Sequence, residues 1–136
     1  MTLTDAGPLI ALIDADEADH ERCRAALTEL HLPLLTTWPA FTEAMYLLGQ
    51  TGWKGQQALW TLVLREDLQI ASSSSDQNKR AAELMERYSD RPMDLADATL
   101  VALAENRGLK RIFTLDSDFH IYRLYDREHF EVVPQL

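Results

Sequence analysis

The sequence predicts an α/β fold, in which a central, mostly parallel five-stranded sheet lies between two layers of helices. Two observations lead to this prediction. Five short apolar or β-branched segments are separated by longer segments whose apolar residues recur at helical spacing. Strands that alternate with helices are typical of a parallel sheet covered on both faces. We expect one such domain over residues 1–136, because this length supports one core but not two.

The first half of the chain contains three of the expected strands. We expect strands at residues 1–4, 34–36 and 68–71, and helices at residues 9–13, 17–30 and 53–65. A further helix begins after Thr37, which suits an N-cap, and Pro39 fits its first turn. The glycines of residues 49–52 end that helix.

The second half begins with a serine run that we interpret as a loop and a helix cap. From Ser75 a helical segment follows, which the Arg91–Pro92 step interrupts. Residues 94–106 form the most regular helical stretch, and Gly108 stands where a helix C-terminus favours glycine. The remaining expected elements are strands at residues 111–115 and 131–133 and a short helical piece that begins at Asp116.

Carboxylates follow the strands or open the helices in four separate segments. They are Asp5 after the first strand, Glu43 early in the helix after the second strand, Asp94 and Asp97 at the start of the 94–106 helix, and Asp116 and Asp118 after the 111–115 strand. In an open parallel sheet, the carboxyl ends of the strands and the starts of the next helices share one edge, where ligands bind. We therefore expect these acids to meet in one crevice.

A divalent cation suits such a cluster. Magnesium and manganese prefer hard oxygen ligands, and carboxylates held close together repel one another unless a cation lies between them. A bound Mg²⁺ or Mn²⁺ can activate a water for attack on phosphorus, and a second ion can stabilise the leaving oxygen.

Each acid taken alone also has a structural explanation. Asp94, Asp97 and Asp116 could serve helix N-termini. Asp5, beside a Gly-Pro pair, could be a turn residue, and Glu43 could lie on a solvated helix face. The convergence of all four segments favours a shared site.

The net charge of −9 is unusual for a protein that binds nucleic acid. Either the substrate is not nucleic acid, or divalent cations reverse the local sign where the acids gather. In the second case RNA affinity depends on local basic residues, for which the candidates are Arg65, Lys79, Arg80, Arg87 and Arg91.

The remaining composition indicates a cytoplasmic protein. The single cysteine, Cys23, cannot form an intramolecular disulfide, and the N-terminal apolar run is interrupted by Asp14 and Asp16. We therefore expect neither a signal peptide nor a membrane span. The three tryptophans, Trp38, Trp53 and Trp60, are expected in the core or in a dimer interface rather than as base-stacking platforms.

The order and the local sequences of the acidic motifs resemble those of the PIN domains, especially the VapC-type toxins of prokaryotic toxin–antitoxin pairs. The matching segments are residues 3–9 (LTDAGPL), 37–48 (TWPAFTEAMYLL), 93–98 (MDLADA) and 114–119 (TLDSDF). They span almost the whole chain. The last two, at their mutual distance, are the most specific.

The resemblance implies a metal-dependent ribonuclease with a three-layer fold around a five-stranded parallel sheet. It implies Asp5 and Asp97 as metal ligands, with Glu43 orienting the ion or its water and Asp116 completing the catalytic quartet. It further implies supporting roles for Asp94, Thr114 and Asp118. The partners that it implies are an RNA substrate, a second copy in a homodimer, and a small antitoxin protein whose tail enters the acidic groove.

Two other functions are compatible with an acidic α/β protein. A catalytically silent binding module would use its acids only as caps and as a docking surface. A magnesium-dependent phosphoacceptor domain would need adjacent acids after the first strand and a lysine after a late strand. Ala6 follows Asp5, and Lys110 precedes its strand, so the sequence disfavours the phosphoacceptor.

Overall fold

A five-stranded sheet forms the centre of the computed structural model, which describes residues 1–135. Its strands are β1 (Thr2–Thr4), β2 (Leu34–Thr37), β3 (Leu68–Ala71), β4 (Arg111–Phe113) and β7 (Glu131–Val133). They lie in the order β3-β2-β1-β4-β7, and every pairing is parallel. The predicted five-stranded parallel sheet is confirmed.

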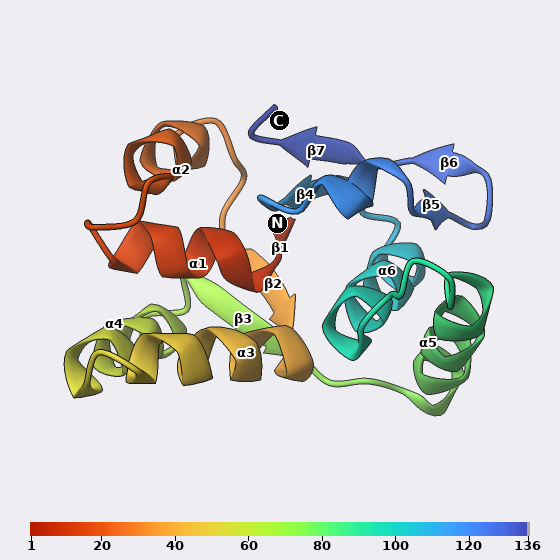
Figure 1. Ribbon diagram of the computed structural model, residues 1–136, viewed down its shortest axis with the longest axis horizontal. Helices are drawn as coiled ribbons and strands as arrows, with labels where there is room; N and C mark the ends of the chain where they lie inside the picture. Colours follow the sequence, from red (N-terminus) through yellow and green to blue (C-terminus); the bar gives the residue numbers. More distant parts are fainter. Residues whose placement is uncertain (136) are drawn as a thin grey trace.

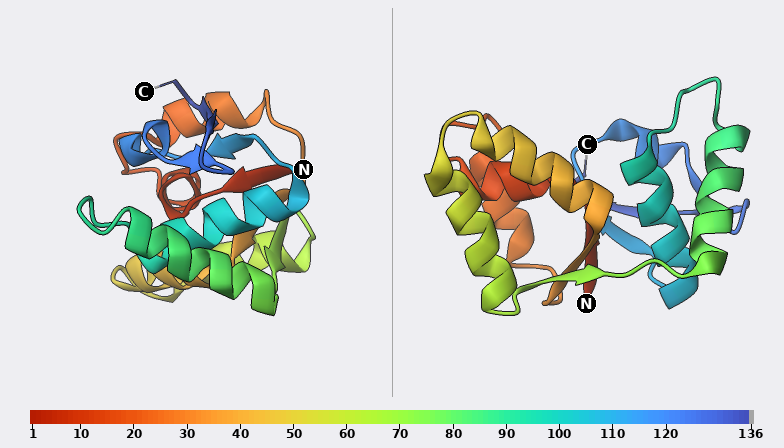
Figure 2. Two further views of the ribbon diagram at one scale, coloured as in Figure 1. Left: turned by 90° about the vertical axis from the view of Figure 1, so that its right-hand side faces the viewer. Right: turned by 90° about the horizontal axis from the view of Figure 1, so that it is seen from below.

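Helices cover both faces of this sheet. They are α1 (Ala6–Ile13), α2 (His20–Leu27), α3 (Trp38–Gly49), α4 (Trp53–Leu64), α5 (Ser75–Arg87) and α6 (Leu95–Arg107). Figures 1 and 2 show α1 to α4 gathered on one side of the strands and α5 with α6 on the other. The predicted three-layer α/β/α arrangement is therefore confirmed.

The two layers have separate cores because side chains alternate along each strand. Leu35 and Ile112 pack with α5 and α6, whereas their neighbours Leu34 and Phe113 pack with α1 to α4. All four side chains are buried. Both faces of the sheet are thus apolar, which leaves its edges and strand ends for polar groups.

The helix ends follow local capping rules. Ser74 caps α5 in a capping box with Gln77, one residue before the predicted start. Asp94 caps α6, and Gly108 ends that helix in the left-handed conformation with φ of 66°. Thr37 precedes α3 as predicted, but its hydroxyl bonds Thr99 rather than the helix end.

Several predicted bounds are wrong. Helix α1 starts at residue 6 rather than 9, because Asp5 caps it and Pro8 is tolerated in a first turn. Helix α2 covers residues 20–27 rather than 17–30, and β4 ends at Phe113 rather than at residue 115.

A two-stranded antiparallel hairpin was not predicted. It consists of β5 (Arg123–Leu124) and β6 (Glu128–His129), and its turn places Tyr125 and Asp126 at positive φ. Its sequence lacks the glycine that usually occupies such turns. Glu105 on α6 holds this turn, because it accepts hydrogen bonds from Tyr125 N and, through its backbone carbonyl, from Tyr125 Oη.

The tryptophans were expected in the core or in a dimer interface; the core is wrong, and the dimer interface stays a prediction. Trp38, Trp53 and Trp60 are 51%, 60% and 36% exposed. They belong to α3 and α4, where Trp38 and Trp60 make edge contacts with the buried Phe41. Within residues 1–135, none of the helices combines the length and apolar composition needed to cross a membrane.

Candidate metal centre

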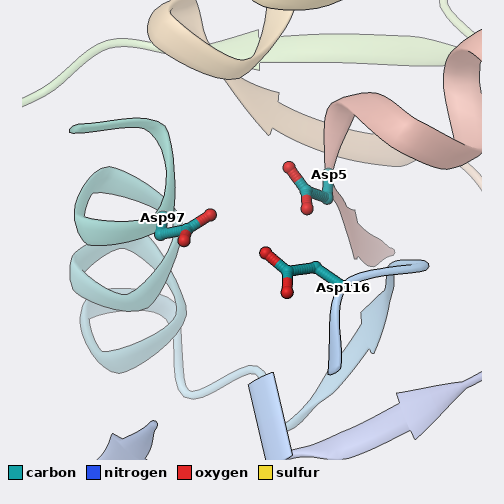
Figure 3. Close-up of side chains that lie close together, drawn as sticks. All are labelled: Asp5, Asp97 and Asp116. Carbon is teal, nitrogen blue, oxygen red and sulfur yellow. The ribbon is translucent and has the colours of Figure 1, made fainter. Parts of the chain in front are cut away.

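Three carboxylates from distant parts of the chain meet at the carboxyl edge of the sheet. One oxygen from each of Asp5, Asp97 and Asp116 lies within 4.8 Å of the other two. Figure 3 shows the three side chains pointing toward one another, from the end of β1, from α6 and from the loop after β4. The convergence expected from the sequence occurs for these three acids.

Parallel pairing accounts for this convergence. β1 and β4 are neighbours with Thr4 opposite Phe113, so that Asp5 and Thr114 leave the sheet side by side. The N–H of Asp5 donates to the Phe113 carbonyl at 2.9 Å, which extends the strand pairing to the acid itself. The sheet therefore fixes the backbone at Asp5 and at the start of the segment that leads to Asp116.

A buried threonine connects two of the acids. The hydroxyl of Thr114 donates to Oδ2 of Asp5 at 3.0 Å, and the backbone N–H of Asp116 donates to the same hydroxyl oxygen at 3.0 Å. Asp5 Oδ1 accepts from the N–H of Ala6 at 2.8 Å. Both oxygens of Asp5 are thus oriented by donors from the chain itself.

Two further acids line the same cavity, which has a volume of about 260 Å³. They are Glu43 on α3 and Asp94 at the start of α6. Asp94 is also the helix cap, since its Oδ1 accepts from the N–H of Asp97 at 2.8 Å. Both residues are exposed, in contrast to the buried Asp5 and Asp97.

Asp118 lies outside this cavity lining. Its carboxylate pairs with Arg91 at 3.1 Å, while its N–H donates to Oδ1 of Asp116 at 2.9 Å. Asp118 therefore supports the turn of Asp116 through its backbone, and its side chain makes a partly exposed ion pair with the segment before α6.

Burial and mutual repulsion raise the pKa values of the clustered acids. The pKa of Asp97 rises to about 8, through burial first and then the charges of Asp94 and Asp5. The pKa of Asp5 rises to about 6, mainly through burial, although the donors Ala6 and Thr114 oppose the shift. The pKa values of Glu43 and Asp116 are also raised, with burial as the largest cause.

The cluster fits a hard divalent cation. Its donors are carboxylate oxygens, and oxygens that share one Mg²⁺ at about 2.1 Å lie roughly 3–4 Å apart. The observed limit of 4.8 Å requires only a small adjustment. Among residues 1–135, neither Asp97 Oδ1 nor Asp116 Oδ2 is engaged by a protein hydrogen bond, so both oxygens can accept a ligand.

Tyr122 is a residue of this centre that the sequence analysis did not identify. Its buried hydroxyl donates to Oδ2 of Asp97 at 2.9 Å. No spacing rule links a tyrosine to an acid 25 residues earlier, so no motif could have indicated the contact.

Several of the basic residues proposed for RNA contacts are paired with acids of the chain. Arg80 makes two hydrogen bonds to Glu105, at 2.8 and 3.1 Å, and a third to Asp126. Arg87 also lies 3.6 Å from Asp126. Within the described residues, Arg91 is the one cation with an ion pair to an acid of the four motifs, through Asp118. In the part of the chain that the structure describes, none of the candidate basic residues lines the acidic cavity.

A larger hollow, of about 530 Å³, lies elsewhere. It is lined by α2, β7 and neighbouring residues, and its charged groups include the paired Arg111 and Glu131. Among residues 1–135, the potential metal ligands that lie close together are Asp5, Asp97 and Asp116, so the smaller acidic cavity is the candidate metal centre. Lys110, which a phosphoacceptor would need beside the acids, precedes β4 and so lies at the opposite end of that strand.

Known proteins resemble this chain in sequence over most of its length. The PIN domain family model matches residues 2–124. The chain is 25% identical over 134 residues to Ribonuclease VapC26 of Mycobacterium tuberculosis, an alignment that covers 97% of this chain and 99% of that protein.

Solved structures share the fold. VapC20 of Mycobacterium tuberculosis, described as a toxin that cleaves the sarcin-ricin loop, aligns with a TM-score of 0.79 and 21% identity over 87% of this chain and 92% of its own. A toxin–antitoxin complex from Klebsiella pneumoniae aligns with a TM-score of 0.67 and 22% identity, over 88% and 90% of the two chains. VapBC2 of Rickettsia felis, bound to promoter DNA, aligns with a TM-score of 0.66 and 13% identity, over 96% and 97%.

Proposed function

The chain belongs to the PIN-domain family, and from this premise we propose that it is a divalent-metal-dependent ribonuclease and the toxin of a toxin–antitoxin pair. The substrate class follows the related ribonuclease, which aligns over nearly the full length of both chains. The observation that carries the proposal is the meeting of Asp5, Asp97 and Asp116, which come from three separate segments.

Some residues of the site bind the cation, and others position the residues that bind it. Asp5 and Asp97 are the metal ligands, because they are the most buried acids of the cavity and face each other across it. Asp116 completes the inner set. Thr114 fixes the Asp5 carboxylate. The Asp94 carboxylate accepts from the backbone N–H of Asp97, and the backbone N–H of Asp118 donates to the Asp116 carboxylate.

Glu43 has the most freedom among the acids. It lies on α3 at the rim of the cavity and is exposed, so that its carboxylate can reach a water or a substrate hydroxyl without leaving its helix. We assign Glu43 the role of orienting the attacking water, because a carboxylate at the rim of the cavity is in reach of solvent.

A bound Mg²⁺ or Mn²⁺ supplies two things to this site, which are neutralisation of phosphate charge and a lower pKa for water. The protein residues hold the cation and orient the attacking water. Cation binding also offsets the repulsion among the acids, which accounts for a site that is so strongly acidic in the free protein. The phosphate of RNA can approach the cavity only when this negative charge is compensated.

The proposed partners also follow from the surface. Several large exposed apolar side chains belong to α3 or α4, namely Trp38, Tyr46, Leu47, Trp53, Trp60 and Leu64. The two helices pack against each other, and exposed apolar side chains on neighbouring helices are typical of a protein–protein interface. We propose that an antitoxin covers this surface and places a basic segment in the acidic cavity, and that the toxin forms a homodimer.

The enzymatic proposal is tested with purified protein and RNA. We expect cleavage only when Mg²⁺ or Mn²⁺ is added, and we expect Asp5→Asn and Asp97→Asn each to reduce the rate at least a hundredfold with the fold retained. Asp16→Asn is the matched control, because Asp16 is an exposed acid remote from the cavity lining. Full activity in both cavity variants, or equal cleavage in EDTA, would contradict the proposal.

The partner proposal needs a separate experiment. If a small open reading frame lies beside the gene, co-expression with it is expected to give a complex that is stable to gel filtration. Light scattering of the toxin alone is expected to give the mass of a dimer. A chain that is tolerated at high expression without any partner would contradict the toxin role but not the nuclease chemistry.

A further inference from the structure

Tyr122 links the two segments that face each other across the acidic cavity. It lies just after the short 3-10 helix η1 (Ser117–His120), and its backbone N–H donates to the Asp118 carbonyl at 3.0 Å. Its hydroxyl reaches α6 and donates to Oδ2 of Asp97 at 2.9 Å. A single side chain therefore connects the turn of Asp116 to the acid on the opposite wall.

The position of this hydroxyl is fixed by aromatic packing. The fully buried ring of Tyr122 makes edge contacts with Tyr88, at 5.1 Å between centroids, and with Phe119, at 5.2 Å. Phe119 in turn makes an edge contact with Phe130, at 5.5 Å. Because these rings interlock, the hydroxyl cannot turn away from Asp97 without moving the core.

Asp97 needs such a restraint. Its carboxylate faces Asp5 and Asp116, and this repulsion favours rotation of the side chain away from the cavity. Within residues 1–135, Tyr122 is the only group that donates a hydrogen bond to the Asp97 side chain. With Oδ2 held, the other oxygen remains directed at the shared site.

From this geometry we infer that Tyr122 is a positioning residue, whose hydroxyl holds Asp97 in the orientation that binds the cation. This inference rests on the proposed metal-dependent function. Groups that orient a metal ligand typically change metal affinity or activity by about 10- to 100-fold when they are removed. A tyrosine that served only to fill the core would not affect metal affinity.

The chain offers a matched pair of variants. Tyr122→Phe removes the hydroxyl and keeps the ring. Tyr88→Phe removes a hydroxyl from the same aromatic cluster. The Tyr88 hydroxyl accepts from the backbone N–H of Arg123 at 3.1 Å, and among residues 1–135 it makes no hydrogen bond to an acid of the cavity. Both variants lose one hydroxyl next to the same rings. They differ mainly in the hydrogen bond that is lost, which is the one to Asp97 in Tyr122→Phe and the one from Arg123 N–H in Tyr88→Phe.

The experiment measures Mn²⁺ affinity of the full chain by electron paramagnetic resonance, and RNA cleavage by steady-state kinetics. For Tyr122→Phe we expect an approximately tenfold or larger rise in the Mn²⁺ Kd and a comparable fall in kcat, with KM for RNA within twofold. For Tyr88→Phe we expect both constants to stay within twofold of the wild-type values.

Each other outcome is decisive. Wild-type Mn²⁺ affinity in Tyr122→Phe would overturn the inference and leave the proposed function intact, whether or not the melting temperature falls. Failure of Tyr122→Phe to fold would also overturn it, because the hydroxyl would then be a structural requirement. A wild-type chain that binds no Mn²⁺ at millimolar concentration would overturn the proposed function together with the inference.

Discussion

Replacing Asp97 by asparagine should stabilise the protein in the absence of metal, although it destroys the metal site. The carboxyl of Asp97 has a pKa of about 8 in the folded chain, against 3.8 as its ordinary value. In the unfolded chain the group is ionised above pH 4, whereas the folded chain retains its proton up to about pH 8. The folded state thus binds more protons in this window, and stability falls as the pH rises from 4 to 8.

The magnitude follows from the size of the shift. At about 1.4 kcal/mol per pKa unit, the proton that Asp97 takes up on folding at pH 7.5, where the unfolded chain is ionised, costs at most roughly 5 kcal/mol. Water that enters the open cavity reduces this cost, and the asparagine amide must still be accommodated beside Asp94. We therefore expect Asp97→Asn to raise the free energy of unfolding by about 2 kcal/mol at pH 7.5, which corresponds to roughly 5–10 °C in melting temperature for a chain of this size.

Thermal unfolding in EDTA, monitored by circular dichroism at pH 5 and pH 7.5, measures this effect. The gain from Asp97→Asn should be large at pH 7.5 and small at pH 5, and Asp16→Asn should show no gain at either pH. An Asp97→Asn melting temperature at or below the wild-type value at pH 7.5 would refute the reasoning, because it would mean that the carboxylate is not destabilised by its surroundings.

Three further predictions concern the same site. Mn²⁺ at a hundred times its Kd should stabilise the wild-type chain by about 2.7 kcal/mol, seen as a rise in melting temperature that is absent in Asp97→Asn. Asp94→Ala should lower the free energy of unfolding by about 1 kcal/mol in urea titrations, because it removes the cap of α6. Asp94→Asn should retain most of the stability, since asparagine can also cap a helix. Equal losses in the two variants would contradict the capping role. Arg91→Ala should change stability by less than about 1 kcal/mol, since its pair with Asp118 is partly exposed, and a larger loss in the same titration would show that the pair anchors the loop before α6.

The elements that the sequence predicts best are those with strong local signals. Residues 68–71 and 131–133 are strands with the predicted bounds, and α6 lies between a capping aspartate and a C-terminal glycine as predicted. Local capping and strand patterns are properties of neighbouring residues, so that one sequence is enough to read them.

The meeting of the acids could also be predicted, because it depends on topology alone. Parallel strands deliver their following residues to one edge, whatever the details of packing. Which acids form the inner set could not be predicted in this way. The exposure of Glu43 and the pairing of Asp118 with Arg91 depend on helix positions that periodicity does not specify.

The misses arise from tertiary contacts. The β5–β6 hairpin depends on Glu105 of α6, which holds its turn in place of a glycine. The hydrogen bond of Tyr122 with Asp97, and the exposure of the tryptophans on α3 and α4, likewise follow from how helices dock on the sheet. Neither leaves a pattern in the local sequence.

The central claim is that remote acids share one bound cation. Crystals grown or soaked with Mn²⁺ and measured near the manganese absorption edge test it directly. We expect an anomalous peak in the cavity, at about 2.1–2.2 Å from oxygens of Asp5 and Asp97, with Asp116 in direct or water-mediated contact. The absence of a peak there at saturating Mn²⁺, or a peak only in the hollow between α2 and β7, would contradict the claim.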